Sequence, residues 1–302
     1  FSYQQHLYSA MAANELIPLA VGDRNLVSLP FFHIGGLAII FRCLLSGATL
    51  VLGKNKNISE DLVKFKITHT SMVATQLRRL LKQNTKCISL KHALIGGGPV
   101  DEQLLNEAKK SGLNCWQTYG LTEMSSQVYT HNPSGKGQRL QHSEIMINDK
   151  QEICVKGKTL FLGYYESNSE NSTHLRLPLN KSGWFETRDQ ARFNGSKLEI
   201  IGRVDNQFIS GGENIQPEEI EFFVNKIQGV NQSIVVAQKD AEYGLRPVIF
   251  VESEDPISLN ALQHQLKPYL PTFKLPKAIF PWEDSFGLKV SRKLLTQQLS
   301  LP

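Results

Sequence analysis

Three consecutive glycines stand where a predicted strand gives way to a predicted helix. The segment is Ile95-Gly-Gly-Gly-Pro-Val100, and residues without a side chain let a flat ligand approach the backbone closely. The first turn of the following helix favours an anion, because its free N–H groups carry partial positive charge. Glycine-rich turns of this kind also occur for purely geometric reasons. Alone, the segment leaves a ligand site and a simple connection both open.

A second segment, Thr118-Tyr-Gly-Leu-Thr-Glu123, also follows a predicted strand. Tyr119 offers a face for stacking, Gly120 allows close approach, and Thr122 carries a hydroxyl. The carboxylate of Glu123 suits Mg²⁺ beside a phosphate. The alternative is a helix start, at which Thr122 or Glu123 satisfies free N–H groups. The spacing alone does not decide between the two.

Three charged residues further along could complete a nucleotide site. Asp189 could accept hydrogen bonds from two adjacent hydroxyls, as a ribose offers, and Arg203 could meet a ribose or phosphate oxygen. The alternative for both is a surface ion pair of little energetic value. Lys289 lies in a glycine-containing segment near the C-terminus, where most lysines are solvated surface charges.

The residues that position these groups alternate between helix and strand patterns. Polar N-caps, apolar periodicity and glycine stops predict helices and strands in turn, with Ser59 as one N-cap. This alternation predicts a parallel sheet flanked by helices. The predicted helices span 59–65, 75–83 and 101–110, and the strands 67–70, 92–95 and 115–118.

The pattern changes twice after this alternating part. Short strands with alternating apolar and polar residues predict an antiparallel sheet or small barrel at 144–148, 152–156 and 197–201, with an exposed loop at 166–173. After Arg203 an α+β unit follows. Pro217 is expected in the first turn of a helix whose apolar face carries Ile220, Phe223, Val224 and Ile227, and Ser258 is expected to open a second helix. Strands are predicted at 233–237 and 248–251.

Composition excludes several classes of protein. The chain has 302 residues, of which 41% are hydrophobic, so a chain without a core is excluded and two domains are expected. A net charge of +5, spread along the chain, does not indicate nucleic-acid binding. The cysteines, at positions 43, 87, 115 and 154, are too far apart for a zinc or redox motif. The longest apolar run, near residues 34–41, is too short to span a bilayer.

Taken together, these segments resemble the adenylate-forming superfamily, which includes acyl-CoA synthetases, luciferases and peptide-synthetase adenylation domains. The match runs from about Leu29 to Arg292. It rests on the joint order of Tyr-Gly-Leu-Thr-Glu, Gly-Arg-x-Asp and Gly-Gly-Glu-Asn-Ile-x-Pro, at the positions given by Tyr119, Gly202 and Gly211. The resemblance implies an α/β fold: the remaining part of a large domain, with a parallel sheet layer and an antiparallel subdomain, followed by a small mobile α+β domain. The expected boundaries are 1–204, with the antiparallel subdomain at about 143–204, and 205–302.

Within the superfamily the chain resembles most the bacterial 2-succinylbenzoate–CoA ligases of menaquinone synthesis. Pro30-Phe-Phe-His-Ile-Gly-Gly-Leu37 carries part of this resemblance. Thr187-Arg188-Asp189 stands where most acyl-CoA synthetases have Thr-Gly-Asp. Gly287-Leu288-Lys289 stands where most have glycine directly before the lysine. The resemblance implies ATP-dependent activation of an aromatic dicarboxylate and transfer to CoA, with Mg²⁺, in the cytoplasm. It implies no nucleic acid and no membrane insertion, and it leaves a homo-oligomer possible.

The resemblance also implies a role for each matching residue. Gly97, Gly98 and Pro99 line the adenine pocket, Tyr119 stacks on the base beside Gly120, and Thr122 faces phosphate. Glu123 holds Mg²⁺, Asp189 holds the ribose hydroxyls with help from Arg203, and Asp205 is the hinge of the small domain. Lys289 is catalytic, Gly211 and Gly212 help to form the CoA tunnel, and His33 belongs to the acyl pocket, where Ser125, Ser126 and Gln127 are further candidates.

One part of the family pattern has no match in the chain. The family carries a phosphate-binding loop rich in Ser, Thr and Gly and ending in Pro-Lys, and nothing before Phe31 matches it. With Phe1 as the first residue, we expect that the chain starts just after this loop. The alternatives to a succinylbenzoate ligase are therefore another acyl- or aryl-CoA synthetase and an inactive adenylate-binding fragment.

Overall fold

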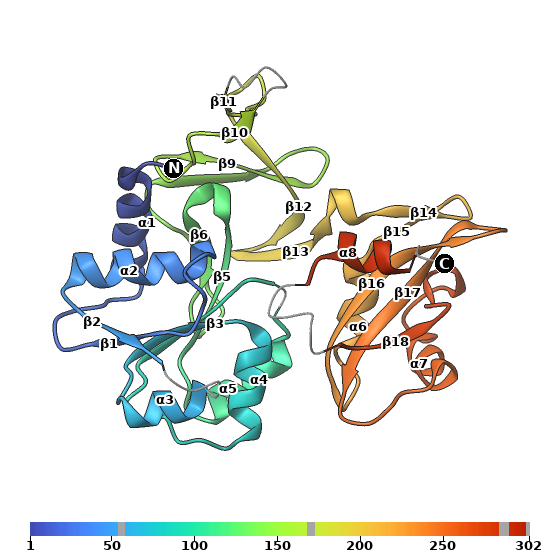
Figure 1. Cartoon of the computed structure of the whole chain (residues 1–302), viewed down its shortest axis with the longest axis horizontal. Helices are drawn as coiled ribbons and strands as arrows, with labels where there is room; N and C mark the ends of the chain where they lie inside the picture. The colour runs from blue at the N-terminus through green and yellow to red at the C-terminus, as the bar shows by residue number, and fades with distance from the viewer. Residues whose placement is uncertain (54–57, 99, 168–172, 284–289, 300–302) are drawn as a thin grey trace. The chain divides into compact units, whose positions relative to one another are not determined.

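A computed structural model describes residues 1–53, 58–98, 100–167, 173–283 and 290–299 (Figure 1). The chain divides into two compact units. The first comprises Phe1–Thr187 and Ala191–Glu199, and the second comprises Arg188–Gln190 and Ile200–Pro302. This division by contacts does not test the boundary expected between residues 204 and 205, which stays a prediction.

The first unit is built on a seven-stranded sheet in the order β2-β1-β3-β4-β5-β6-β7. Strands β2, β1, β3, β4 and β5 run parallel, and β6 and β7 are antiparallel. The expected parallel sheet is confirmed, with an antiparallel edge. The strands are β1 (Arg24–Val27), β2 (Thr49–Leu52), β3 (His69–Met72), β4 (His92–Ile95), β5 (Cys115–Leu121), β6 (Ser126–His131) and β7 (Gly137–Arg139).

Helices cover both faces of this sheet, because its strands turn apolar side chains to both sides. Leu26 packs in a core with α3, α4 and α5, whereas its neighbour Val27 packs with Ile39 of α2. Figure 1 shows α3, α4 and α5 gathered apart from α1 and α2. No helix within the described ranges is both long and apolar enough to cross a membrane. The helices are α1 (Tyr3–Leu16), α2 (Ile34–Ser46), α3 (Ile58–Lys64), α4 (Ala74–Lys82) and α5 (Glu102–Lys110).

The prediction that Ser59 caps a helix is wrong. Helix α3 already includes Ile58, and Ser59 lies inside it, buried, with its hydroxyl bonded to Gln83 Oε1. A hydroxyl that bonds to a neighbouring helix does not need the cap position. The helix predicted at 101–110 is confirmed as α5, and Asp101 is its N-cap, accepting a hydrogen bond from the backbone N–H of Gln103 at 3.1 Å.

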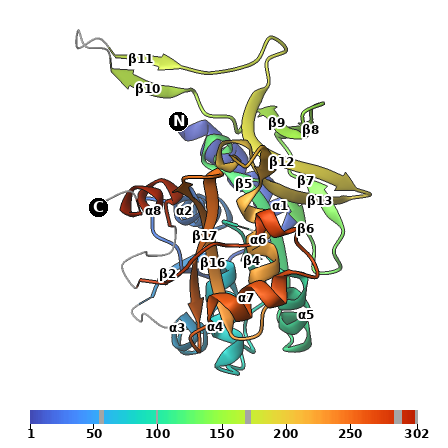
Figure 2. The same cartoon turned by 90° about the vertical axis from the view of Figure 1, so that its right-hand side faces the viewer.

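The expected antiparallel part is a four-stranded sheet in the order β13-β12-β9-β8. Its strands are β8 (Ser143–Ile147), β9 (Glu152–Gly157), β12 (Phe185–Asn194) and β13 (Lys197–Arg203). The loop predicted at 166–173 is wrong at its ends, because the hairpin of β10 (Tyr164–Ser167) and β11 (Thr173–Arg176) includes them. Residues 168–172 lie outside the described part. The hairpin projects from its unit in both views (Figures 1 and 2).

The second unit is an α+β arrangement around a three-stranded sheet, β16-β17-β18. Alternate residues of its strands again face opposite sides: Val235 packs with α6 and α7, and Val236 packs with Leu295 of α8. Pro217 opens α6 and Ser258 caps α7, as predicted. The elements are β14 (Phe208–Ser210), β15 (Glu213–Ile215), α6 (Pro217–Val224), β16 (Val230–Asp240), β17 (Gly244–Ser253), α7 (Leu259–Leu266), β18 (Ile279–Pro281) and α8 (Arg292–Gln298).

A buried histidine lies at the start of β3. His69 is 2% exposed, and its two ring nitrogens lie 2.9 Å from the carbonyl oxygen of Pro18 and 2.8 Å from Thr68 Oγ1. A neutral imidazole satisfies both contacts, donating to the carbonyl and accepting from the hydroxyl. Burial lowers the pKa of His69 to about 4.

We expect this histidine to make stability depend on pH. The unfolded chain binds a proton on His69 near pH 6.5 and the folded chain only near pH 4, so the unfolded chain holds more protons between these values. The free energy of unfolding should therefore fall by about 1–3 kcal/mol as pH drops from 6.5 to 4. Urea unfolding at several pH values tests this, with His69→Gln expected to reduce the slope.

Candidate functional site

The two predicted nucleotide segments lie side by side. Strands β4 and β5 are parallel neighbours, with Ile95 opposite Gln117, so the chain leaves both strands at the same edge of the sheet. A Cβ atom built on Gly96 would lie 2.8 Å from Thr118 Cγ2. This carboxyl edge is where ligands bind in open α/β sheets. The structure therefore brings the glycine segment and the Thr118–Glu123 segment together.

The three glycines of the first segment serve different needs. Gly96 is packed against Thr118, and Gly97 has a φ of +84°, which favours glycine. A Cβ atom on Gly98 would meet no atom of the described residues within 4 Å, and its φ does not require glycine. Pro99 lies outside the described part. The fold thus explains the glycines at 96 and 97, whereas the open space at 98 is free for a ligand.

The Thr118–Glu123 segment forms the end of a strand and not the start of an α-helix. β5 continues to Leu121, and one 3-10 turn, Thr122–Met124, leads into β6. Gly120 is needed here, because a Cβ atom would lie 2.0 Å from the backbone oxygen of Ser126. Thr122 is exposed and Glu123 is half-buried. Both side chains are therefore accessible beside the glycine segment.

The carboxylate of Glu123 fits the predicted role toward Mg²⁺. Its Oε1 accepts a hydrogen bond from the hydroxyl of Tyr164 at 2.8 Å. Among the described residues, Oε2 has no hydrogen-bond partner. The described ranges also hold no group of three His, Cys, Asp or Glu side chains that could form a protein-only metal site. A single carboxylate suits Mg²⁺, which takes its other ligands from water and substrate phosphates.

The residues expected around the acyl group are more scattered. His33 is exposed and precedes α2, with its carbonyl accepting from Gly36 N–H at 3.0 Å and Leu37 N–H at 3.1 Å. Its loop follows β1, so it lies at the same edge of the sheet as the glycine segment. Ser125 is buried, and its hydroxyl already donates to the carbonyl of Thr159 at 3.0 Å. Ser126 is partly buried, and the side chain of Gln127 is buried, with its Oε1 accepting from Thr130.

Sequence reasoning missed a buried cation on α2. Arg42 is 3% exposed, and burial lowers the pKa of its guanidinium to about 10. Its Nε donates to Asn14 Oδ1 at 2.8 Å and its Nη2 to the carbonyl of Ile17 at 3.0 Å. Both partners are neutral, and no carboxylate of the described residues forms an ion pair with it. The sequence of this mostly apolar helix does not indicate that its arginine is buried.

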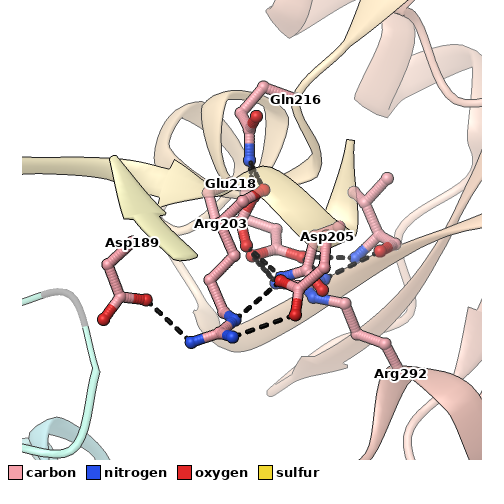
Figure 3. Close-up of polar contacts among 9 residues, drawn as sticks. Asp189, Arg203, Asp205, Gln216, Glu218 and Arg292 are labelled. Carbon is pink, nitrogen blue, oxygen red and sulfur yellow. Dashed lines mark hydrogen bonds and ion pairs between the residues drawn. The ribbon is translucent and has the colours of Figure 1, made fainter. Parts of the chain in front are cut away.

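A second group of predicted residues comes together in the second unit (Figure 3). Arg203 donates from Nη1 to Asp189 Oδ1 at 2.9 Å. It also forms a two-pronged pair with Asp205, from Nε at 2.8 Å and from Nη2 at 2.9 Å. These hydrogen bonds hold the pKa of Asp205 below its ordinary value and that of Arg203 above it. The three residues predicted for ribose and hinge are thus one charged cluster.

This cluster continues into contacts that sequence reasoning did not find. The side-chain N–H₂ of Gln216 donates to the carbonyl of Arg203 at 3.1 Å and to Glu218. Arg292, the first residue of α8, lies 3.4 Å from Glu218 and forms a two-pronged ion pair with the buried Glu221. Figure 3 shows this chain of contacts from Asp189 to Arg292. A motif match identifies such residues singly but not the contacts between them.

Two glycines predicted for CoA form the turn between β14 and β15. Gly211 and Gly212 have φ values of +57° and +88°, so the turn needs glycine at both positions. The N–H of Gly211 donates to the carbonyl of Tyr243 at 3.0 Å, and a Cβ on Gly211 would lie 2.7 Å from the Tyr243 ring. Lys289 lies outside the described residues. The predicted site residues therefore fall into one group in each compact unit.

Comparison with known proteins shows which family the chain resembles. A family model described as AMP-binding enzyme matches residues 2–165. The 2-succinylbenzoate–CoA ligase of Haemophilus influenzae is 38% identical, with 98% of this chain and 66% of that protein covered. The enzyme of the same name from Salmonella typhimurium is 36% identical, with 97% and 64% covered. The chain thus spans slightly less than two thirds of the length of these relatives.

Solved structures of the same kind of enzyme are similar along the whole chain. A variant of Escherichia coli MenE with bound OSB-AMS has a TM-score of 0.90 and 34% identity, over 99% of this chain and 65% of that one. The o-succinylbenzoate CoA synthetase of Bacillus subtilis, in complex with the acyl-adenylate OSB-AMP, has a TM-score of 0.84 and 30% identity, over 100% and 65%. These similarities confirm the expected fold class, and the chain belongs to the AMP-binding enzyme family.

Proposed function

We propose that this chain serves the ATP-dependent ligation of 2-succinylbenzoate to CoA, a step of menaquinone biosynthesis in the cytoplasm. The observation that carries the proposal is the meeting of the glycine segment and the Thr118–Glu123 segment at the carboxyl edge of β4 and β5. The similarity to the 2-succinylbenzoate–CoA ligases of Haemophilus influenzae and Salmonella typhimurium supports the choice of acid. Their alignments cover 97–98% of this chain, including both segments.

The first step joins two anionic reactants, so it depends on positioning and on neutralising charge. A carboxylate oxygen of the acid attacks the α-phosphorus of ATP, the bond to the β-phosphate oxygen breaks, and pyrophosphate leaves. We assign the adenine to the space beside Gly98 and Tyr119, and phosphate oxygens to Thr122. Mg²⁺ held by Glu123 would neutralise phosphate charge, and Lys289 is assigned as the catalytic cation.

The second group of residues is assigned to the ribose and to the second step. Asp189, oriented by Arg203, accepts hydrogen bonds from the ribose hydroxyls. In the second step the CoA sulfur attacks the acyl carbon, the bond to the AMP oxygen breaks, AMP leaves, and the thiol proton is released. The Gly211-Gly212 turn is assigned to the path of the CoA thiol and Asp205 to the hinge between the steps.

The acid carries a second carboxylate that does not react, and its site needs a polar or cationic contact. Ser126 and His33 are accessible candidates, whereas Ser125 would have to release the carbonyl of Thr159. Arg42 is a further candidate in the same unit, because a buried guanidinium with only neutral partners gains from an anion. These contacts would distinguish 2-succinylbenzoate from acids without a second carboxylate.

The direct test is a CoA-ligase assay with 2-succinylbenzoate, ATP and Mg²⁺. It should be run on the 302-residue chain and on any longer gene product that contains it. We expect CoA-ester formation with 2-succinylbenzoate at a kcat/KM at least tenfold above that with benzoate. Equal or faster turnover of benzoate or a fatty acid would contradict the assigned substrate while leaving the family unaffected.

The open space at Gly98 gives a prediction for nucleotide binding. Gly98→Ala adds a methyl group that no described atom opposes, so stability should change by less than about 0.5 kcal/mol. If the adenine lies there, the methyl group should weaken ATP binding by about 5- to 150-fold, which corresponds to about 1–3 kcal/mol of overpacking. Calorimetric titration and thermal unfolding measure the two effects.

Gly120→Ala is the matched contrast. Its methyl group would meet the backbone of Ser126, which cannot move like a side-chain tip. We expect a loss of stability above about 2 kcal/mol in addition to any loss of binding. Unchanged ATP affinity in Gly98→Ala would show that the base binds elsewhere.

A further inference from the structure

We propose that Tyr164 is a positioning residue for the metal-binding carboxylate of Glu123, an inference that rests on the proposed function. Tyr164 begins the β10–β11 hairpin, 41 residues after Glu123 in the sequence. Its hydroxyl donates to Glu123 Oε1 at 2.8 Å. No predicted role covers this tyrosine, and the contact joins the hairpin to the nucleotide segment.

Glu123 needs such a partner, because its own surroundings do little to fix its side chain. It lies in a single 3-10 turn and is half-buried, and no cation of the described residues forms an ion pair with it. Its backbone carbonyl accepts from the N–H of Phe161 at 2.7 Å. Residues 161 and 164 of one short segment thus hold both the main chain and the carboxylate of Glu123.

Tyr164 is 38% exposed, and an aromatic and a cationic side chain contact its ring. Its ring meets Phe161 edge to face, with the ring centroids 4.8 Å apart, and Phe161 in turn meets Phe185 at 5.4 Å. The guanidinium of Arg176, paired opposite Tyr164 in the hairpin, lies 5.7 Å from its ring centroid. Arg176 is held by Glu166 at 2.7 Å. The position of the hydroxyl is therefore set by aromatic contacts and by the hairpin.

A neutral hydroxyl donor is well suited to this task. An Arg or Lys in its place would bring a positive charge that repels a metal ion and competes for the carboxylate. The tyrosine occupies one oxygen of Glu123, leaves the charge of the carboxylate intact, and leaves Oε2 for the metal ion. Removing partners of this kind from metal ligands typically lowers metal affinity by about 10–100-fold.

The experiment compares three variants of the 302-residue chain by Mn²⁺ binding in the presence of ATP, followed by electron paramagnetic resonance. Tyr164→Phe keeps the ring packing and removes only the hydroxyl, and we expect Mn²⁺ affinity to fall about tenfold. Tyr165→Phe removes a hydroxyl from the next residue, which is 73% exposed, and should bind like wild type. Glu123→Gln should lose the site. Thermal unfolding of each variant checks that the fold is retained.

The outcomes separate this inference from the function on which it rests. If wild type binds Mn²⁺ with ATP and Tyr164→Phe matches it, Tyr164 only packs the hairpin and the inference is wrong. If Tyr164→Phe and Tyr165→Phe weaken binding equally, the effect is not specific to the Glu123 contact and the inference is also wrong. If wild type takes up no Mn²⁺ with ATP, the metal site itself is wrong and the inference falls with it.

Discussion

Replacing Lys289 by alanine should slow formation of the acyl-adenylate by about three orders of magnitude, the scale of losing one transition-state contact. The first step brings a carboxylate to a triphosphate, and a cation at the α-phosphate lowers the cost of that approach. The second step attacks an acyl-adenylate with a thiol and has no such need. Conversion of preformed succinylbenzoyl-adenylate with CoA should therefore survive the substitution. Pyrophosphate exchange and a CoA-capture assay measure the two half-reactions separately.

A matched control for this variant lies four residues further on. Lys293 is an exposed lysine in the first turn of α8, so Lys293→Ala changes the same charge without the assigned role. It should leave both half-reactions within about twofold of wild type, as surface substitutions generally do. An equal loss of both half-reactions in Lys289→Ala would contradict its assignment to the first step.

The alternating part of the fold could be predicted from the sequence because its patterns are local. The strand at 92–95 and the helix that follows Asp101 are bounded by glycines and a polar cap, and the structure confirms both. The loops after β4 and β5 lie close together because neighbouring parallel strands end at the same edge of a sheet. That the glycine segment and the Thr118–Glu123 segment lie together could therefore be predicted from the sequence.

The β10–β11 hairpin shows why other parts could not be predicted. Its strands are polar, and the side chain of Leu175 is 57% exposed, so there is no apolar face to produce alternation. Cross-strand pairs such as Tyr164 with Arg176 stabilise it instead. A polar segment of this kind is predicted to be a loop. Its contacts, including that of Tyr164 with Glu123, therefore cannot be predicted from the sequence.

The charged cluster of the second unit marks a different limit. Asp189, Arg203 and Asp205 were each singled out by type, but the ion pair of Arg203 with Asp189 depends on β12 and β13 being neighbours. The ion pair of Arg292 with Glu221 forms between largely buried side chains, and the sequence does not indicate the burial of these charged residues. Burial alone would lower the pKa of Arg292, but its hydrogen bonds to Glu221 and the negative charges of Glu221 and Glu218 together outweigh this, and the pKa is raised.

The assignment of Asp205 as hinge gives the second large effect. Asp205 lies in the 3-10 turn Val204–Asn206, shortly after the chain passes from the first compact unit to the second at residues 199–200. Asp205→Pro fixes φ near −65° and restricts Val204 as well. A hinge needs only a few residues to absorb a large change in φ and ψ. We expect one half-reaction to fall by about 100-fold and the other to stay within a few-fold, because one domain orientation is trapped.

Asp205→Ala separates the backbone effect from the loss of the ion pair. It removes the carboxylate that Arg203 binds but leaves the backbone free to rotate. The side chains of Asp205 and Arg203 are 52% and 42% exposed, so this pair should contribute less than about 1 kcal/mol. Arg203 also keeps Asp189 as a partner. Both half-reactions of Asp205→Ala should therefore stay within a few-fold of wild type. Similar rates for Asp205→Pro would show that the chain does not pivot there. Similar losses in both variants would show that Asp205 acts through its carboxylate, since only the carboxylate is missing from both.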